Sequence, residues 1–213
     1  MECLLKSEHF FDATNKGCFV RTPVDIVVGT LRSFGLTVDE GSTHYDLFEL
    51  QYVQNAILAD MQMVPGDPPN VAGWQAFRQF PQYYRMWINS DTIRNRNQYT
   101  DIISVTDFFQ SSFSGDIIRI DPVAFASQFD DPQDPNKLID DVVRLLLPQP
   151  ISDIKKGLLK SILLSGLPTD NYWTAAWFDY IDNPDDPMAV EVVTVRLSIL
   201  CNYVLKLPEY QLA

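Results

Sequence analysis

Residues 134–147 read DPNKLIDDVVRLLL, and their pattern decides the fold class. Apolar side chains recur at the three- and four-residue spacing of one helix face: Leu138, Ile139, Val142, Val143, Leu145 and Leu146. Asp140 and Arg144 are four positions apart, which predicts an ion pair on the side that faces water. Asp134 provides a capping oxygen before Pro135, and proline suits the first helical position because its missing N–H has no helical partner there. The stretch therefore predicts an amphipathic helix that begins at Pro135.

The same start signal occurs at three other places. A side chain with a capping oxygen precedes proline at Thr22-Pro23, Asp121-Pro122 and Asp186-Pro187. Asp25 lies three residues after Thr22, which predicts a capping box. We therefore expect helices to begin at four prolines.

Further apolar stripes extend the helical pattern over most of the chain. The first stripe is Val24, Val27, Val28 and Leu31, and Gly35 ends it. The second, within about 43–63, is Leu47, Leu50, Ile57, Leu58 and Met61, and the third is Ile154, Leu158, Leu159, Ile162 and Leu163, opposite Lys155, Lys156 and Lys160. The fourth is Val193, Leu197, Leu200, Val204 and Leu207, and Pro208 ends it. We also expect a helix over 91–113 and a short extended piece at 117–120 that makes no sheet. The prediction is an all-α protein, a single multi-helix domain over 1–213 with little or no sheet and a sub-boundary near 114–121.

Charge and composition exclude several classes of protein. Acidic side chains outnumber basic ones by 28 to 16, which gives a net charge of −12. Nucleic acid is not an expected partner, because its phosphates are bound by clustered Lys and Arg. An anionic membrane surface is disfavoured for the same reason. No uninterrupted apolar run approaches the ~20 residues of a membrane helix, and the start MECLLKSEHFF is not a signal peptide, so no transmembrane segment is expected.

The long irregular segment 65–89 holds the candidate binding residues. It reads PGDPPNVAGWQAFRQFPQYYRMWIN and is rich in proline, aromatic rings and arginine. One hypothesis is a ligand site in which four rings stack on the ligand and three arginines hold its polar or anionic groups. Its residues would be Trp74, Tyr83, Tyr84 and Trp87, with Arg78, Arg85 and Arg94. The alternative is that the segment wraps the helices, buries its rings and pairs its arginines with the surplus carboxylates.

Signals for metal binding and catalysis are weak. Two clusters of oxygen ligands, Asp130, Asp131, Asp134 and Asn136 and then Asp182, Asn183, Asp185 and Asp186, lack the spacing of an EF-hand. Both clusters precede an expected helix, where aspartate caps the helix and interacts favourably with its dipole. The three cysteines, Cys3, Cys18 and Cys201, show no metal-ligand spacing, and the two histidines, His9 and His44, accompany no GxSxG motif. We therefore expect no metal, no cofactor and no identifiable catalytic residue.

Several short motifs together resemble a known family. They are HFFD (residues 9–12), RTPVDIVVGTLRSFG (21–35), PPNVAGW (68–74), WINSDTIRNR (87–96) and LPEYQL (207–212). In combination they resemble the carboxyl-terminal part of the bacterial domain of unknown function 1800 (DUF1800) family, in the version found in Bacteroidetes-like bacteria. The resemblance implies a mostly helical fragment of a longer, exported protein, located in the periplasm or outside the cell. It also implies that the amino-terminal part of the same protein is a partner, and it supplies no activity.

We expect a non-catalytic binding or assembly module, whose ligand would be a glycan, a peptide or an envelope protein. A second interpretation makes the chain a structural scaffold that completes a larger protein, and it predicts an exposed apolar face. A third is part of a hydrolase whose site needs the missing amino-terminal region.

Overall fold

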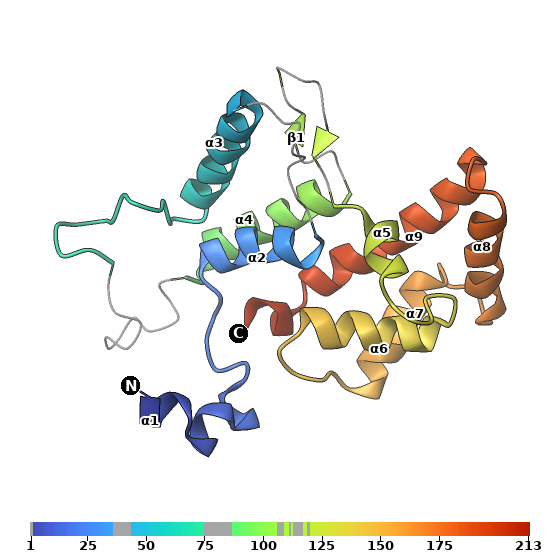
Figure 1. The fold of residues 1–213 in the computed structure, drawn as a ribbon, viewed down its shortest axis with the longest axis horizontal. Helices are drawn as coiled ribbons and strands as arrows, with labels where there is room; N and C mark the ends of the chain where they lie inside the picture. The colour runs from blue at the N-terminus through green and yellow to red at the C-terminus, as the bar shows by residue number, and fades with distance from the viewer. Residues whose placement is uncertain are drawn as a thin grey trace.

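The computed structural model describes residues 2–35, 44–74, 87–105, 109–110, 112, 117–118 and 120–213. Figure 1 shows an arrangement of helices joined by loops, with an amino-terminal arm that extends away from the other helices. The helices are α1 (Glu2–Leu5), α2 (Pro23–Ser33), α3 (His44–Asp60), α4 (Ser90–Ser104), α5 (Pro122–Ser127), α6 (Pro135–Leu146), α7 (Asp153–Leu163), α8 (Asn171–Asp182) and α9 (Pro187–Leu205). Short 3₁₀ turns are η1 (Glu8–Phe11), η2 (Ala13–Asn15) and η4 (Pro208–Gln211). The predicted all-α class is confirmed.

All four predicted proline starts are confirmed. Helices α2, α5, α6 and α9 each begin at the proline, and the residue before it accepts a backbone N–H bond. At α2 the capping box is complete: the Thr22 backbone N–H donates to Asp25 (3.0 Å), and the Asp25 N–H donates to the Thr22 hydroxyl (3.2 Å). Local sequence is sufficient here because a cap depends only on residues within one helical turn.

Helix α9 is the central element of the core. It packs against α4, α5, α6, α7 and α8, and Figure 1 shows it running between α4 and α5 on one side and α6 and α7 on the other. The side chains predicted to face inward are buried, and they are Val193, Leu197, Leu200, Val204 and Leu207. One cluster of buried residues includes members from both sides of the expected sub-boundary.

The helix predicted over 91–113 ends at Ser104, so its carboxyl-terminal third is wrong. The strand β1 (Phe109–Gln110) follows and pairs antiparallel with β2 (Ile117–Ile118). The extended piece predicted at 117–120 is confirmed at Ile117–Ile118, but it pairs with a neighbouring strand instead of remaining single.

Two other predictions about side chains are corrected by tertiary contacts. Arg144 pairs with Asp141 (2.6 Å) instead of Asp140, because α7 packs on α6 and brings Lys156 to Asp140 (2.7 Å). Leu145, Ile154 and Leu158, expected inside, are exposed. The neighbouring helices therefore cover only part of the apolar stripes predicted for α6 and α7.

Within the described chain, α9 also meets the length and composition criteria for a membrane-spanning helix. Its most apolar window has a mean hydropathy of 1.6, although Glu191 and Arg196 interrupt the run in the sequence. A core helix meets the same criteria, and 39% of that window is buried.

Candidate functional site

The described part of the Pro65–Arg96 segment places three of the seven predicted ligand-binding residues. Trp87 is buried, with 6% of its surface exposed, and its ring lies 5.7 Å from that of the partly exposed Trp74. Arg94 is exposed on α4. Arg78, Tyr83, Tyr84 and Arg85 lie outside the described residues. The ligand-binding role of these residues stays a prediction.

A neighbouring arginine that was not among the predicted site residues has an internal role. Arg96 is 1% exposed, and its guanidinium donates to the Gln211 side chain (3.0 Å) and to the carbonyls of Arg21 (2.8 Å) and Trp87 (2.9 Å). Burial lowers the pKa of Arg96 to about 10, while the charge of Asp25 raises it. The group therefore remains protonated at neutral pH. It connects the end of the aromatic segment to the residue before the N-cap of α2 and to η4.

The aspartate clusters act as caps and ion-pair partners. Asp134 accepts from the Asn136 N–H (2.9 Å), Asp186 accepts from the Met188 N–H (3.2 Å), and Asp131 pairs with Lys137 (2.6 Å). Across the described ranges, no group of three His, Cys, Asp or Glu side chains is placed to hold a metal ion.

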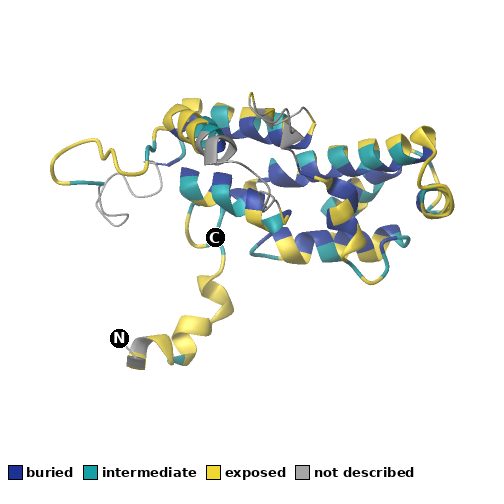
Figure 2. Cartoon of the chain, turned by 45° about the horizontal axis from the view of Figure 1, so that its top comes forward, coloured by how far each residue is buried: buried dark blue, intermediate teal, exposed yellow. Residues whose placement is uncertain are grey.

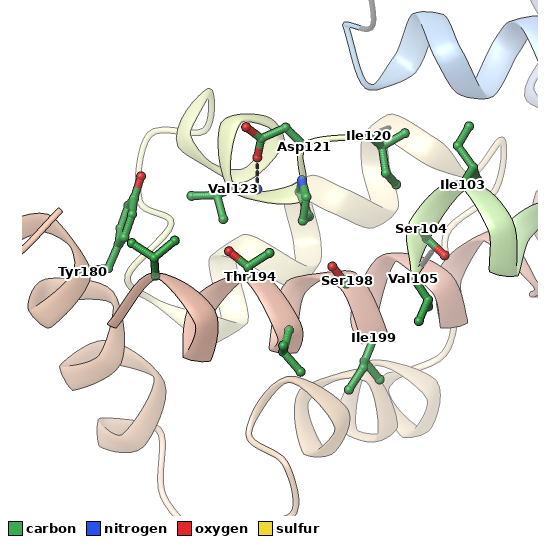
Figure 3. A pocket seen from close by; sticks show the side chains of 13 residues that line it. Ile103, Ser104, Val105, Ile120, Asp121, Val123, Tyr180, Thr194, Ser198 and Ile199 are labelled. Atoms are coloured by element: carbon green, nitrogen blue, oxygen red, sulfur yellow. Dashed lines mark hydrogen bonds between the residues drawn. The ribbon is translucent and has the colours of Figure 1, made fainter. Parts of the chain in front are cut away.

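A cavity of about 520 Å³ lies between the end of α4, the start of α5 and one side of α9. Its walls are mainly aliphatic, and Figure 3 shows Thr194 and Ser198 of α9 facing Asp121 and Val123 across it. Among the described residues that line it, none is His, Cys, Lys or Arg. The volume is typical of a site that holds a small molecule or several apolar side chains.

Two of the polar side chains at this cavity, Asp121 and Ser104, already serve the fold. The Asp121 carboxylate accepts from the N–H groups of Val123 and Ala124 (both 2.9 Å) and so caps α5. The Ser104 hydroxyl donates to the Thr100 carbonyl (2.5 Å) and accepts from the Asn202 amide (2.9 Å). With these two side chains engaged, the mainly aliphatic walls of the cavity are suited to holding apolar groups.

Beside the cavity, α9 carries a second apolar surface that faces outward. We call it the outer stripe; its members are Met188, Val192, Val195, Ile199 and Tyr203. Their exposed fractions range from 36% at Val192 to 73% at Met188, and their spacing of three and four residues aligns them on one helix face. Val195 and Ile199 also line the cavity, so the stripe and the cavity form one continuous surface.

The sequence analysis identified the inner face of α9 and missed the outer stripe. The signal was present, because Glu191 and Arg196 are the only charged residues from Pro187 to Leu205. A helix that is apolar on all sides is expected to be covered on all sides. In the described residues the outer side is open to solvent, and Figure 2 shows exposed residues gathered where α8 meets α9.

Comparison with known proteins gives one result. The profile of the family described as "Protein of unknown function (DUF1800)" matches residues 1–212. No curated protein matches the chain, and no solved structure does. The resemblance to this family is thereby confirmed at the level of the family.

Proposed function

The chain belongs to the DUF1800 family, and we propose that it is a non-catalytic binding or assembly module. Its docking surface is the outer stripe of α9 together with the adjoining cavity, and its ligand is another polypeptide. The proposal applies to the described helices and needs no residue from the aromatic segment.

The observation that carries the proposal is the partial covering of α9. The helix carries apolar side chains on its inner face and again along the outer stripe, yet only the inner face packs against other helices. Monomeric proteins rarely leave a contiguous apolar surface open, and such surfaces mark interaction sites. A surface helix that needed only to complete the core would carry polar residues at positions such as Val195 and Ile199.

The cavity supports binding of apolar groups. It is continuous with the stripe through Val195 and Ile199, so a polypeptide lying on α9 could insert apolar side chains into it. This is the usual anatomy of an interface, in which anchor residues of one partner fill a pocket of the other.

The same exposed face also favours the scaffold interpretation as a second candidate. In that case the amino-terminal part of a longer protein covers the outer stripe, and the contact is within one chain. The two candidates predict the same surface and differ in the molecule that covers it.

Photo-crosslinking of the full chain in its own cell distinguishes these candidates. A crosslinking amino acid would replace Ile199 in one variant and Ile154 in the control, because Ile154 is 87% exposed on α7, outside both the stripe and the cavity. A partner crosslinked from position 199 would then be purified and its affinity measured for wild type, Ile199→Asp and Ile154→Asp.

A binding module gives a crosslink to a second protein from position 199, and its affinity falls at least tenfold in Ile199→Asp while Ile154→Asp is unchanged. A crosslink within the same chain supports the scaffold. Equal crosslinking from both positions, or an affinity that Ile199→Asp leaves unchanged, contradicts the assignment of this face.

A further inference from the structure

We propose that the partner docked on the outer stripe is a basic amphipathic helix, about 15 residues long, whose cationic side chains lie at the Met188 end. The inference rests on the proposed function and adds the chemistry and direction of the partner.

The charge around the start of α9 is negative and uncompensated. Asp179, Asp182, Asp185, Asp186 and Glu191 are all exposed, and residues 161–195 contain no Lys, Arg or His. None of the five carboxylates forms an ion pair with a described residue. The α6–α7 region differs, because Asp140 pairs with Lys156 there.

The basic groups near the stripe are engaged within the protein. Arg196 donates to the Tyr172 carbonyl (3.2 Å), and Lys206 pairs with Asp101 of α4. Free negative charge is therefore concentrated at the Met188 end. A partner whose cations lie at that end is attracted to these carboxylates, and this attraction disfavours the reversed orientation.

The shape of the surface fits a helix. Met188 and Tyr203 are fifteen positions apart, which corresponds to about 22 Å along a helix at 1.5 Å per residue. An amphipathic helix that presents apolar side chains at i, i+3, i+4 and i+7 matches the stripe and can place anchors in the cavity.

The same charges disfavour two other occupants. A second copy would bring another set of carboxylates onto the same face. An anionic lipid surface would be repelled from the Met188 end.

The test uses three synthetic 18-residue peptides. One is a Leu/Lys amphipathic helix, one is a Leu/Glu helix with the same leucine positions, and one is a scrambled Leu/Lys peptide of equal composition. Binding to the full chain is measured by fluorescence anisotropy at about 0.15 M salt, where charges beyond about 8 Å are screened.

The expected result is that the Leu/Lys helix binds at least tenfold tighter than the other two peptides. Ile199→Asp should weaken this binding at least tenfold, and the matched control Ile154→Asp should leave it unchanged. A variant with Asp182→Asn, Asp185→Asn and Glu191→Gln should bind the Leu/Lys and Leu/Glu helices with affinities within threefold of each other. Circular dichroism melts verify that every variant is folded.

Several outcomes overturn the inference, and they separate it from the proposed function. If the Leu/Lys and Leu/Glu helices bind wild type equally and neither binds Ile199→Asp, the partner is not basic, but the docking face is still correct. Binding that survives Ile199→Asp rejects the site. If the wild type is a dimer in ultracentrifugation and Ile199→Asp is a monomer, the face is occupied by a second copy of the chain instead of a basic helix. If wild type cosediments with phosphatidylglycerol vesicles and Ile199→Asp does not, the face binds a membrane instead of a basic helix.

Discussion

Trp87 and Ile199 belong to regions whose sequences indicate opposite roles. Trp87 lies in a segment of aromatic rings and arginines, which is typical of a binding surface, and its side chain is 6% exposed. Ile199 lies in an apolar helix, which is typical of a core, and 47% of its side chain is exposed. The difference teaches that residue type indicates what a side chain can bind, whereas the packing of neighbouring elements decides whether a partner can reach it.

The two regions also use their charged groups differently. The Arg96 guanidinium is buried, and its two terminal nitrogens donate to three internal acceptors. The carboxylates around the start of α9 are exposed and lack cationic partners among the described residues. Predictions that separate internal from available groups therefore sharpen the comparison.

The largest expected effect compares the two faces of α9. Leu197→Ala removes a side chain that is 1% exposed and should lower the free energy of unfolding by about 2–5 kcal/mol, because it leaves a cavity in the core. Ile199→Ala should lower it by less than about 0.5 kcal/mol. Urea denaturation of both variants measures the difference. Equal losses would show that the outer stripe is covered in solution.

The next effect concerns the two arginines of α4. Arg96→Met should lower the free energy of unfolding by about 2–4 kcal/mol, because it leaves buried carbonyl groups without donors. Arg94→Met should change it by less than about 0.5 kcal/mol, since Arg94 is exposed. Thermal and urea unfolding provide the measurement.

A melting experiment with added ligands tests whether the aromatic segment packs internally or binds a ligand. If a glycan or a cell-wall peptide raises the melting midpoint of wild type and not that of Arg94→Ala, the segment is a binding site as well.

A smaller effect separates two adjacent aspartates at the start of α9. Asp186→Ala removes the cap of the helix and should lower the free energy of unfolding by about 1 kcal/mol. Asp185→Ala should leave stability nearly unchanged, because no cap depends on it. In the peptide experiment both variants should weaken binding of the Leu/Lys helix. If neither does, the carboxylates at this end do not contact the partner.

The smallest expected change in unfolding free energy tests whether the Lys206 ammonium is paired with Asp101 in solution. Burial raises the pKa of Asp101, but hydrogen bonds from Lys206 and Asn202 and the charge of Lys206 lower it below its usual range. A carboxyl with a lowered folded-state pKa adds stability above its unfolded pKa of about 3.9, and this is lost as pH falls through the folded value.

Asp101→Asn should therefore lower the free energy of unfolding by less than about 1 kcal/mol at pH 7, since the pair is partly exposed. The loss should shrink below about pH 4. Urea unfolding at pH 7 and pH 3, with the loop variant Asp67→Asn as control, measures it. If Asp101→Asn lowers the free energy of unfolding equally at pH 7 and pH 3, Lys206 does not pair with Asp101 and is available to a partner.

Features that depend on neighbouring residues in the chain could be predicted from the sequence. The four proline starts, the Thr22–Asp25 capping box and the inward set of α9 were predictable because caps and helix periodicity act within a few residues. The end of α4 was not predictable, because Phe109–Gln110 becomes a strand by pairing with Ile117–Ile118.

Contacts between distant elements determine which apolar and charged groups remain available. Lys156 pairs with Asp140 because α6 and α7 pack together. Arg96 is internal because it reaches Arg21 and Gln211, which are distant in the sequence. The outer stripe of α9 is open because the described helices that pack on α9 cover its inner face and leave Ile199 half exposed. Burial depends on contacts between distant parts of the chain, and the periodicity of one helix does not contain that information.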